Sequence, residues 1–355
     1  MKVVATIVGA RPQFIKVAPV SRALREAAGM TEVLIHTGQH FDSNMSDIFF
    51  EELGIAPPDR NLDIGGGGHG AMTGLMMQRL EPLLQELDPD LVLVYGDTNS
   101  TLAGALTAAK LHIPVAHVEA GLRSFNRAMP EEINRVMADH LSEWLFASTD
   151  ASITNLRHEG IDRARIHQVG DVMYDAALLF AATAKERPIL ADLGVEPRRY
   201  ILSTLHRAEN TDDPERLATM VAALELVGAQ MPVILPLHPR TRGAMIRNGL
   251  TFDRVKTIDP VGYLDMVALE SSAAVIATDS GGVQKEAFFY EVPCVTLRGE
   301  TEWSELIELG WNELAVSDGT AIGEQILAAV GRRGRSASPY GNGKAAEAIA
   351  AVLAR

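Results

Sequence analysis

Short apolar runs rich in β-branched residues alternate with longer amphipathic stretches in the first half of the chain. The runs predict strands at 3–8, 33–36, 91–95, 113–118 and 166–169, and the stretches predict helices at 11–27, from Asp42, at 70–87, from Thr98 and at 131–145. This alternation is typical of a parallel sheet whose strands are joined by helical crossovers. About six such units predict a doubly wound sheet.

The same alternation restarts in the second half. Strands are predicted at 200–205, 233–237, 275–278 and 292–297, and helices from Pro214, from Gly281 and at 344–353. Between the halves, residues 186–199 are charged and contain two prolines, which is typical of a linker. We therefore expect an α/β protein with two Rossmann-like doubly wound domains and a ligand cleft between them, at the carboxyl ends of the strands.

The composition is that of a globular protein, with 47% hydrophobic and 22% charged residues. No apolar run approaches the roughly 20 residues that cross a bilayer, and Arg11 interrupts the N-terminal apolar stretch, which favours a first strand over a signal peptide. The single cysteine, Cys294, excludes an internal disulfide and a cysteine-ligated metal cluster. These features predict a cytoplasmic protein that does not associate with membranes.

Acidic residues outnumber basic ones, 46 to 32, for a formal net charge of −14. Such a surface repels a phosphate backbone, so nucleic acid is not an expected partner. A small anionic ligand stays compatible with this charge, because a few local cations and backbone N–H groups suffice to hold it.

Common cofactor and metal motifs are absent or misplaced. Residues 65–70 (GGGGHG) fit G-x-G-x-x-G, but they follow a proline-containing loop and not a strand. A mobile loop near a site is therefore a better interpretation than a dinucleotide site. No P-loop sequence is present, and the candidate His, Asp and Glu residues lack H-x-x-x-H or D-x-D spacing, so no metal is expected.

Small residues after a predicted strand form a candidate anion site. In the sequence TDSGG, residues Ser280, Gly281 and Gly282 open a helix, whose N–H groups and positive dipole end attract an anion. Arg11 holds the matching position after the first strand, and Lys16 follows on the same helix; this pair suits a diphosphate. The alternatives are a plain strand–helix turn and an ordinary surface helix.

Acidic residues and histidines also follow predicted strands. Asp97 and Glu119 come after the strands at 91–95 and 113–118, and Glu131 opens a helix. Clustered carboxylates raise one another's pKa values and so prepare for proton transfer, although each alone could be a helix cap or a surface charge. His206 and His238 follow strands of the second half and suit proton transfer or diphosphate binding.

Taken in order, these segments resemble the non-hydrolysing UDP-N-acetylglucosamine 2-epimerase family. The matching stretches are 9–16 (GARPQFIK), 36–40 (HTGQH), 96–100 (GDTNS), 117–123 (HVEAGLR), 129–135 (MPEEINR), 206–210 (HRAEN), 259–264 (DPVGYL), 278–286 (TDSGGVQKE) and 339–343 (PYGNG). The likeness covers nearly the whole chain.

The resemblance implies two Rossmann-like domains arranged as in GT-B glycosyltransferases. The N-terminal domain would comprise residues 1–185 with a C-terminal helix, 342–355, that crosses back to it, and residues 186–341 would bind UDP. The implied reaction inverts C2 of a UDP-2-acetamido sugar without NAD, metal or any other cofactor. UDP is eliminated across C1–C2 to leave a 2-acetamidoglycal, and it adds back after a proton returns to the opposite face. A homodimer is also implied.

By motif position, the resemblance assigns acid–base roles to Asp97, Glu119 and Glu131 and a proton or phosphate role to His206. The residues it implies for UDP binding are Arg11, His238, Ser280, Gly281, Gly282 and Glu286, with Glu286 accepting from ribose hydroxyls. It places Arg298 at the phosphate or sugar and has Lys16 support the acidic cluster.

Two features, which involve three positions, bear on the substrate. Family members that act on UDP-N-acetylglucosamine often have Arg-Pro where this chain has Trp303 and Ser304, and Glu where it has Lys285. Both differences resemble the branch that acts on UDP-2,3-diacetamido-2,3-dideoxyglucuronate, a precursor of lipopolysaccharide O-antigen. Lys285 would then meet the substrate carboxylate or point to solvent. UDP-N-acetylglucosamine is the alternative substrate.

Three other functions stay open at this point. A glycosyltransferase shares the expected architecture, and fold does not determine function. A hydrolysing epimerase would release free UDP and sugar. A nucleotide-sugar sensor would need no catalysis, but it would also have no need for carboxylates clustered beside a diphosphate.

Overall fold

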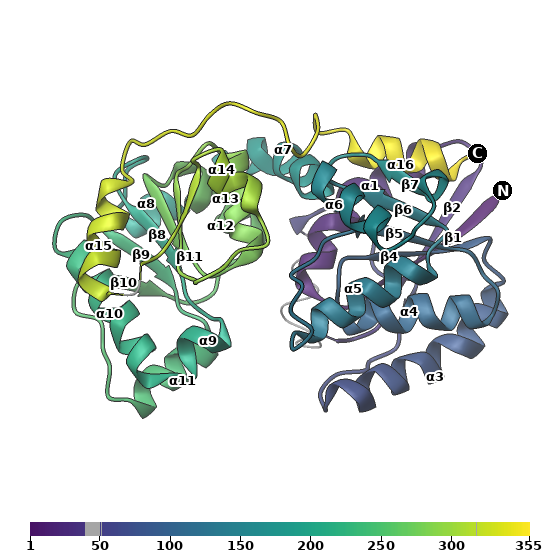
Figure 1. Ribbon diagram of the computed structural model, residues 1–355, viewed down its shortest axis with the longest axis horizontal. Coiled ribbons are helices and arrows are strands. Elements are labelled where there is room, and N and C mark those ends of the chain that lie inside the picture. Colours follow the sequence, from purple (N-terminus) through teal and green to yellow (C-terminus); the bar gives the residue numbers. More distant parts are fainter. Residues whose placement is uncertain (40–49, 51, 317) are drawn as a thin grey trace. The chain divides into compact units, whose positions relative to one another are not determined.

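Two parallel sheets organise the chain, one in each of two units (Figure 1). The computed structural model describes residues 1–39, 50, 52–316 and 318–355. The first unit comprises Met1–Leu179 and Ser338–Arg355, and the second comprises Phe180–Ala337. The helix predicted from Asp42 lies largely outside the described residues.

The described residues of the first unit form a seven-stranded parallel sheet in the order β3-β2-β1-β4-β5-β6-β7. Its strands are β1 (Lys2–Val8), β2 (Met30–His36), β3 (Arg60–Asn61), β4 (Leu91–Tyr95), β5 (Val115–Ala120), β6 (Trp144–Ala147) and β7 (Ile166–Gln168). The order reverses between β1 and β4, where doubly wound sheets bind ligands.

Helices cover both faces of this sheet, with α3, α4 and α5 on one face and α1 and α16 on the other (Figure 1). The helices are α1 (Arg11–Glu26), α3 (His69–Leu87), α4 (Asn99–Lys110), α5 (Pro130–Leu141), α6 (Asp150–His158) and α16 (Ala345–Leu353). A further helix, α7 (Val172–Lys185), begins in this unit and ends in the second. Apolar residues of β1, β4, α3 and α4 form a continuous core between them.

The second unit repeats the design with a six-stranded parallel sheet, β10-β9-β8-β11-β12-β13. Its strands are β8 (Ile201–Thr204), β9 (Val233–Pro236), β10 (Val255–Ile258), β11 (Val275–Thr278), β12 (Cys294–Thr296) and β13 (Asn312–Leu314). Its helices are α8 (Ile189–Leu193), α9 (Ala208–Thr211), α10 (Pro214–Gly228), α11 (Pro239–Arg247), α12 (Tyr263–Ser272), α13 (Gly281–Phe289), α14 (Ser304–Glu308) and α15 (Gly319–Ala328). The predicted α/β class with two parallel-sheet domains is confirmed.

The last helix returns to the first unit, as expected. α16 packs against α1, and Lys2 Nζ donates to the carbonyl of Leu353 at 2.8 Å. Asp175 on α7 accepts hydrogen bonds from the backbone N–H groups of Ala345 and Ala346, at 3.2 and 2.7 Å. This carboxylate satisfies donors that the start of a helix otherwise leaves without partners.

Several elements differ from the prediction. The helix expected at 131–145 ends at Leu141, and its last apolar residues begin β6, because WLFA fits either periodicity. The edge strands β10 and β13 were not predicted, since their sequences VKTI and NEL include polar residues. Residues 186–199, expected as a linker, contain α8, whose apolar side chains pack on a core of the second unit.

Candidate active site

Gln13 holds the turn after β1. Its Oε1 accepts from the N–H groups of Gly9 and Ala10 at 2.8 and 3.0 Å, and its Nε2 donates to the carbonyl of Tyr95 at 2.9 Å. One buried side chain thus links the carboxyl ends of β1 and β4. Arg11 begins α1 beside this turn, and burial lowers its pKa while the charge of Glu52 opposes that shift.

Lys16 and Glu119 form a buried ion pair between α1 and the end of β5. Glu119 has a left-handed backbone, φ +71°, where the pairing of β5 with β6 shifts register. Such a bulge redirects a side chain at some cost in strain. A Cβ at Gly96 would lie 3.2 Å from both the Glu119 carboxylate and Lys16 Nζ, so glycine leaves room for the pair.

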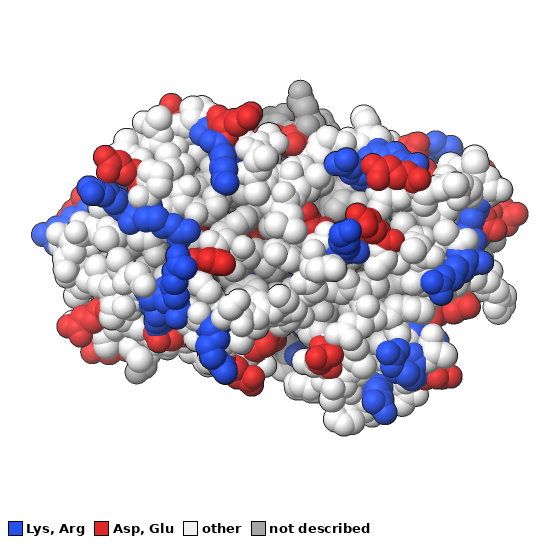
Figure 2. All heavy atoms as spheres, turned by 90° about the horizontal axis from the view of Figure 1, so that it is seen from above, with Lys and Arg blue, Asp and Glu red and all other residues white. Residues whose placement is uncertain are grey.

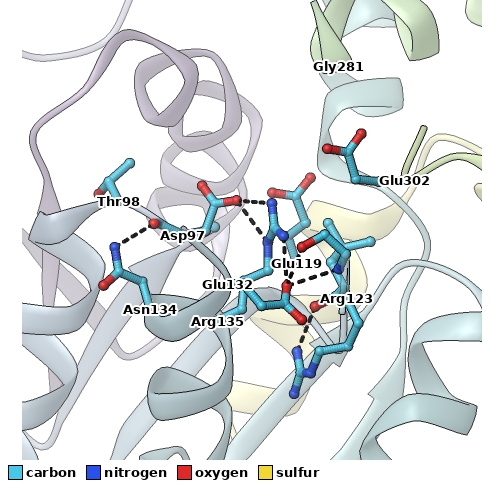
Figure 3. Close-up of polar contacts among 12 residues, drawn as sticks. Asp97, Thr98, Glu119, Arg123, Glu132, Asn134, Arg135, Gly281 and Glu302 are labelled. Carbon is cyan, nitrogen blue, oxygen red and sulfur yellow. Dashed lines mark hydrogen bonds and ion pairs between the residues drawn. The ribbon is translucent and has the colours of Figure 1, made fainter. Parts of the chain in front are cut away.

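Arg135 on α5 binds two carboxylates (Figure 3). Its Nη2 and Nε donate to Asp97 at 2.7 and 2.9 Å, and its Nη1 donates to Glu132 at 2.9 Å. Burial alone would lower the pKa of Arg135, but the charges and hydrogen bonds of both carboxylates outweigh it and raise that pKa. Asn134 adds a bond from its Nδ2 to the backbone carbonyl of Asp97, at 2.9 Å.

Glu132, and not its neighbour Glu131, is built into this network. Glu132 is buried and accepts from the N–H groups of Ser124 and Phe125 at 2.9 and 3.0 Å. Burial alone would raise the pKa of Glu132, yet these bonds and Arg135 lower it. Glu131 is half-buried in the first turn of α5. The prediction missed Glu132, although its three-residue spacing to Arg135 is an i,i+3 pair signal.

A second buried network supports the same strand ends. His117 Nε2 lies 2.7 Å from the carbonyl of Gly96, and its Nδ1 lies 2.7 Å from Asp139. Since a carbonyl only accepts, Nε2 carries a proton. Asp139 on α5 also pairs with Arg123 at 2.7 Å. Through these bonds Gly96, the residue before Asp97, is attached to β5 and α5.

In the second unit, Asp279 organises the loops after β8 and β11. Its carboxylate accepts from the N–H groups of His206 and Arg207 at 2.8 and 2.9 Å and from Asn210 Nδ2 at 3.0 Å. Its other oxygen lies 3.0 Å from His206 Nδ1. Burial alone would raise the pKa of Asp279, but its partners, His206 first, lower it. The prediction quoted this residue without assigning it a role.

The structure brings the two predicted histidines together. The ring centroids of His206 and His238 lie 6.0 Å apart, and His238 Nδ1 accepts from the N–H of Arg240 at 3.2 Å. Nearby in the same unit, Ser280 precedes α13, and a Cβ at Gly281 would lie 3.8 Å from Arg207 Nη2. The start of this helix thus lies near one guanidinium and also near carboxylates, since a Cβ at Gly281 would lie 3.9 Å from Glu302 Oε2 and a Cβ at Gly282 4.0 Å from Glu286 Oε2.

Arg298 and Glu286 are both buried. Arg298 pairs with Glu302 at 2.9 Å and with Glu209 at 3.2 Å. Burial alone would lower the pKa of Arg298, and the carboxylates reverse that effect. The ligand roles that the resemblance assigns to Arg298 and Glu286 stay predictions, as do the roles of the other predicted site residues.

Within the described ranges, no group of three or more His, Cys, Asp or Glu side chains is arranged to hold a metal ion. None of the helices described is long and apolar enough to span a membrane.

Comparisons with known proteins identify the family. The model of the UDP-N-acetylglucosamine 2-epimerase family matches residues 22–354. UDP-2,3-diacetamido-2,3-dideoxy-D-glucuronate 2-epimerase of Pseudomonas aeruginosa is 53% identical over 356 residues, 99% of each chain. A UDP-N-acetylglucosamine 2-epimerase homolog of Methanococcus maripaludis is 53% identical over 333 residues, 92% of each chain.

A solved structure agrees with this family assignment. The crystal structure of Methanocaldococcus jannaschii UDP-GlcNAc 2-epimerase, in complex with UDP-GlcNAc and UDP, has 43% sequence identity and a TM-score of 0.91 over 99% of each chain. The predicted family and isomerase class are confirmed. This chain belongs to the UDP-N-acetylglucosamine 2-epimerase family.

Proposed function

We propose that this protein inverts C2 of UDP-2,3-diacetamido-2,3-dideoxyglucuronate to give the mannuronate epimer. The observation that carries this proposal is the 53% identity, over 99% of both chains, to the Pseudomonas aeruginosa enzyme named for that sugar. UDP-N-acetylglucosamine is the second candidate, because the equally identical Methanococcus maripaludis relative is named for it.

The proposed reaction eliminates UDP and adds it back. A carboxylate takes the C2 proton while the C1–O bond breaks, the C2–H electrons form the C1=C2 double bond, and the C1–O electrons leave with UDP. A proton then returns to the other face of C2, and UDP attacks C1. Because the C2 proton is weakly acidic, removal and departure must be coupled in a site that excludes water.

The carboxylates of the first unit differ in exposure, which supports different roles for them. The Asp97 side chain is 30% exposed although Arg135 holds it, whereas that of Glu132 is 3% exposed. Asp97 is therefore accessible to a ligand, and Glu132 acts as a support. Glu119, held by Lys16, and Glu131 complete the proposed acid–base set.

The second unit offers the groups that a departing diphosphate requires. His206, His238 and Arg298 supply positive charge or donors, and Ser280, Gly281 and Gly282 open a nine-residue helix. The positive end of the helix dipole and its N–H groups stabilise negative charge as it develops on the leaving group. Glu286 would accept from ribose hydroxyls.

The test is an NMR time course in heavy water with each candidate UDP-sugar, without NAD and with a chelator. We expect deuterium at C2 and accumulation of the epimer from the diacetamido-uronate, at a higher rate than from UDP-N-acetylglucosamine. The reverse preference would select the second candidate. Free UDP with free sugar would indicate a hydrolysing enzyme, and binding without exchange would indicate a sensor or a glycosyltransferase.

Substitutions test the residue roles. Asp97→Asn and Glu119→Gln should bind UDP and lower kcat by about 10²-fold or more, the usual contribution of general acid–base catalysis. Glu86→Gln, an exposed glutamate of α3, is the matched control and should keep wild-type kcat. Full activity of either site variant would refute its assigned role.

Four finer expectations rest on the sequence features and on the resemblance. They are a homodimer, a cytoplasmic location, independence of cofactors and a place in lipopolysaccharide O-antigen synthesis. Each stays a prediction; sedimentation of the purified protein tests the first, and the chelated, NAD-free assay tests the third.

A further inference from the structure

Two of the three positions that bear on substrate choice, Lys285 and Trp303, contact each other. Lys285 Nζ lies 4.3 Å from the centroid of the Trp303 ring, and the two residues are 2% and 6% exposed. The alternative in which Lys285 points to solvent is therefore wrong. A buried ammonium over an indole face is attracted by the ring quadrupole more strongly than an exposed one.

Trp303 also contacts the start of α13. Its Nε1 donates to the carbonyl of Gly281 at 3.0 Å. The hydroxyl of Thr301 lies 2.7 Å from Gln284 Oε1 and accepts from the N–H of Trp303 at 3.2 Å. The segment 301–303 is thus attached to the first turn of α13 by the indole and by Thr301.

The bond to Gly281 also bears on the direction of the next N–H group. The carbonyl of Gly281 and the N–H of Gly282 belong to one planar trans peptide, in which they point in opposite directions. This peptide lies in the first turn of α13, where the N–H of Gln284 donates to the carbonyl of Ser280 at 3.2 Å, so the helix itself orients it. Two glycines weaken this end of the helix, and the bond from Trp303 reinforces it from outside.

We propose that Lys285 and Trp303 act as one positioning pair for the turn of Ser280, Gly281 and Gly282. Lys285 fixes the plane of the indole, the indole reinforces the Gly281–Gly282 peptide in its helical orientation, and that peptide presents its N–H to the diphosphate. The inference rests on the proposed function in so far as the anion is UDP. Lys285 thereby acts through Trp303 and not by direct contact with the ligand.

The chain offers a matched control. Trp311 is 5% exposed, and its Nε1 donates to the carbonyl of Arg335 at 3.0 Å, so Trp311→Phe removes the same kind of bond elsewhere in the unit. Trp303→Phe keeps a ring for Lys285 and removes the donor to Gly281. Lys285→Met keeps the apolar stem and removes the charge, and Lys285→Arg restores a cation that binds aromatic faces.

The first measurement is UDP affinity by calorimetry. We expect Trp303→Phe and Lys285→Met each to weaken binding about three- to tenfold, the effect of one hydrogen bond. Lys285→Arg should restore binding, and Trp311→Phe should leave it within about twofold of wild type. In the double variant Trp303→Phe with Lys285→Met, the losses should not add, because both act through one peptide.

The second measurement, hydrogen exchange of residues 280–284 without ligand, does not depend on UDP. It should be faster in Trp303→Phe and Lys285→Met than in wild type and unchanged in Trp311→Phe. Unaltered exchange in these variants would overturn the proposal that Lys285 and Trp303 act as a positioning pair. UDP binding by Trp303→Phe as tight as that of wild type would overturn it too. Additive losses would also overturn it, since Lys285 would then act directly on the ligand. Failure of the wild type to bind UDP, with the exchange effect present, would overturn the proposed ligand and leave the positioning pair established.

Discussion

Glu270 lies on α12 with a fully buried side chain, and neither of its oxygens has a hydrogen-bond partner among the described residues. Burial and the nearby charge of Glu286 both raise the pKa of Glu270 well above its ordinary value. Both effects favour the neutral form of this carboxyl in the folded protein. In the unfolded chain it ionises near its ordinary pKa of about 4.3.

This difference predicts how stability depends on pH. The folded state keeps a proton on Glu270 that the unfolded chain releases above about pH 4.3. The free energy of unfolding therefore falls as the pH rises above that value, by up to about 1.4 kcal/mol per pH unit. Glu270→Gln, which is neutral at every pH, should therefore be more stable than wild type by a margin that grows from pH 5 to pH 8. Urea unfolding at both values measures this margin.

The control is Glu324→Gln, an exposed glutamate of α15. Its unfolding free energy should follow wild type across the same range. A margin for Glu270→Gln that is constant with pH would show that Glu270 is ionised in the folded protein.

At the scale of elements, the end of β1 shows how closely neighbouring segments pack behind the site. Gly9 follows β1, and a Cβ there would overlap the hydroxyls of Thr37 and Ser100, which hydrogen-bond to each other at 2.8 Å. The loop after β2 and the first turn of α4 thus approach the backbone of Gly9 directly. Only a residue without a side chain permits this approach.

The sign of the change in stability can be predicted for a substitution at this junction. Gly9→Ala should lower the free energy of unfolding by about 1–3 kcal/mol, the usual cost of overpacking. Gly70→Ala, in the first turn of α3 where a Cβ meets nothing within 4 Å, should raise it by about 0.5 kcal/mol, because alanine favours helix. Chemical unfolding of both variants checks the opposite signs. A Gly9→Ala protein as stable as wild type would mean that the two hydroxyls can move aside.

At the scale of the whole molecule, one unit interrupts the sequence of the other. Residues 338–355 complete the unit that begins at Met1, while each unit has hydrophobic cores of its own. Figure 2 shows acidic and basic side chains on one face, with a run of basic side chains toward the left of the view and acidic ones beside it. The net charge of −14 agrees with a small anionic ligand better than with nucleic acid.

Because each unit has its own core, the loss of a helix cap in one unit should leave hydrogen exchange in the other unit unchanged. Asp175→Ala removes the acceptor for the start of α16, and Asp213→Ala removes the acceptor at 2.9 and 3.2 Å for the start of α10 in the second unit. Each should cost about 1 kcal/mol. Hydrogen exchange by mass spectrometry should show faster exchange only in the unit that carries the substitution. Faster exchange of β8 and β11 in Asp175→Ala would mean that the units open together.

Sequence alone determined the class of fold, the return of the last helix and the family. The fold class could be predicted because the alternation of strands and helices reflects local burial. The family could be predicted because the order of its motifs can be read without knowing which residues are in contact. It did not determine β6, β10 or β13, because a short strand owes its pairing to neighbours far along the chain. Nor did it single out Glu132, Arg135 and Asp279, whose importance lies in their partners.

Only the tertiary structure decided which side chains meet. Lys16 and Glu119 are 103 residues apart, and Arg135 and Asp97 are 38 apart. Lys285 and Trp303 were each noticed in the sequence, but their contact was not, since periodicity places a residue on a face of its element and does not name what packs against it. Sequence therefore specified the chemistry available to this protein, and packing of distant segments specified how that chemistry is combined.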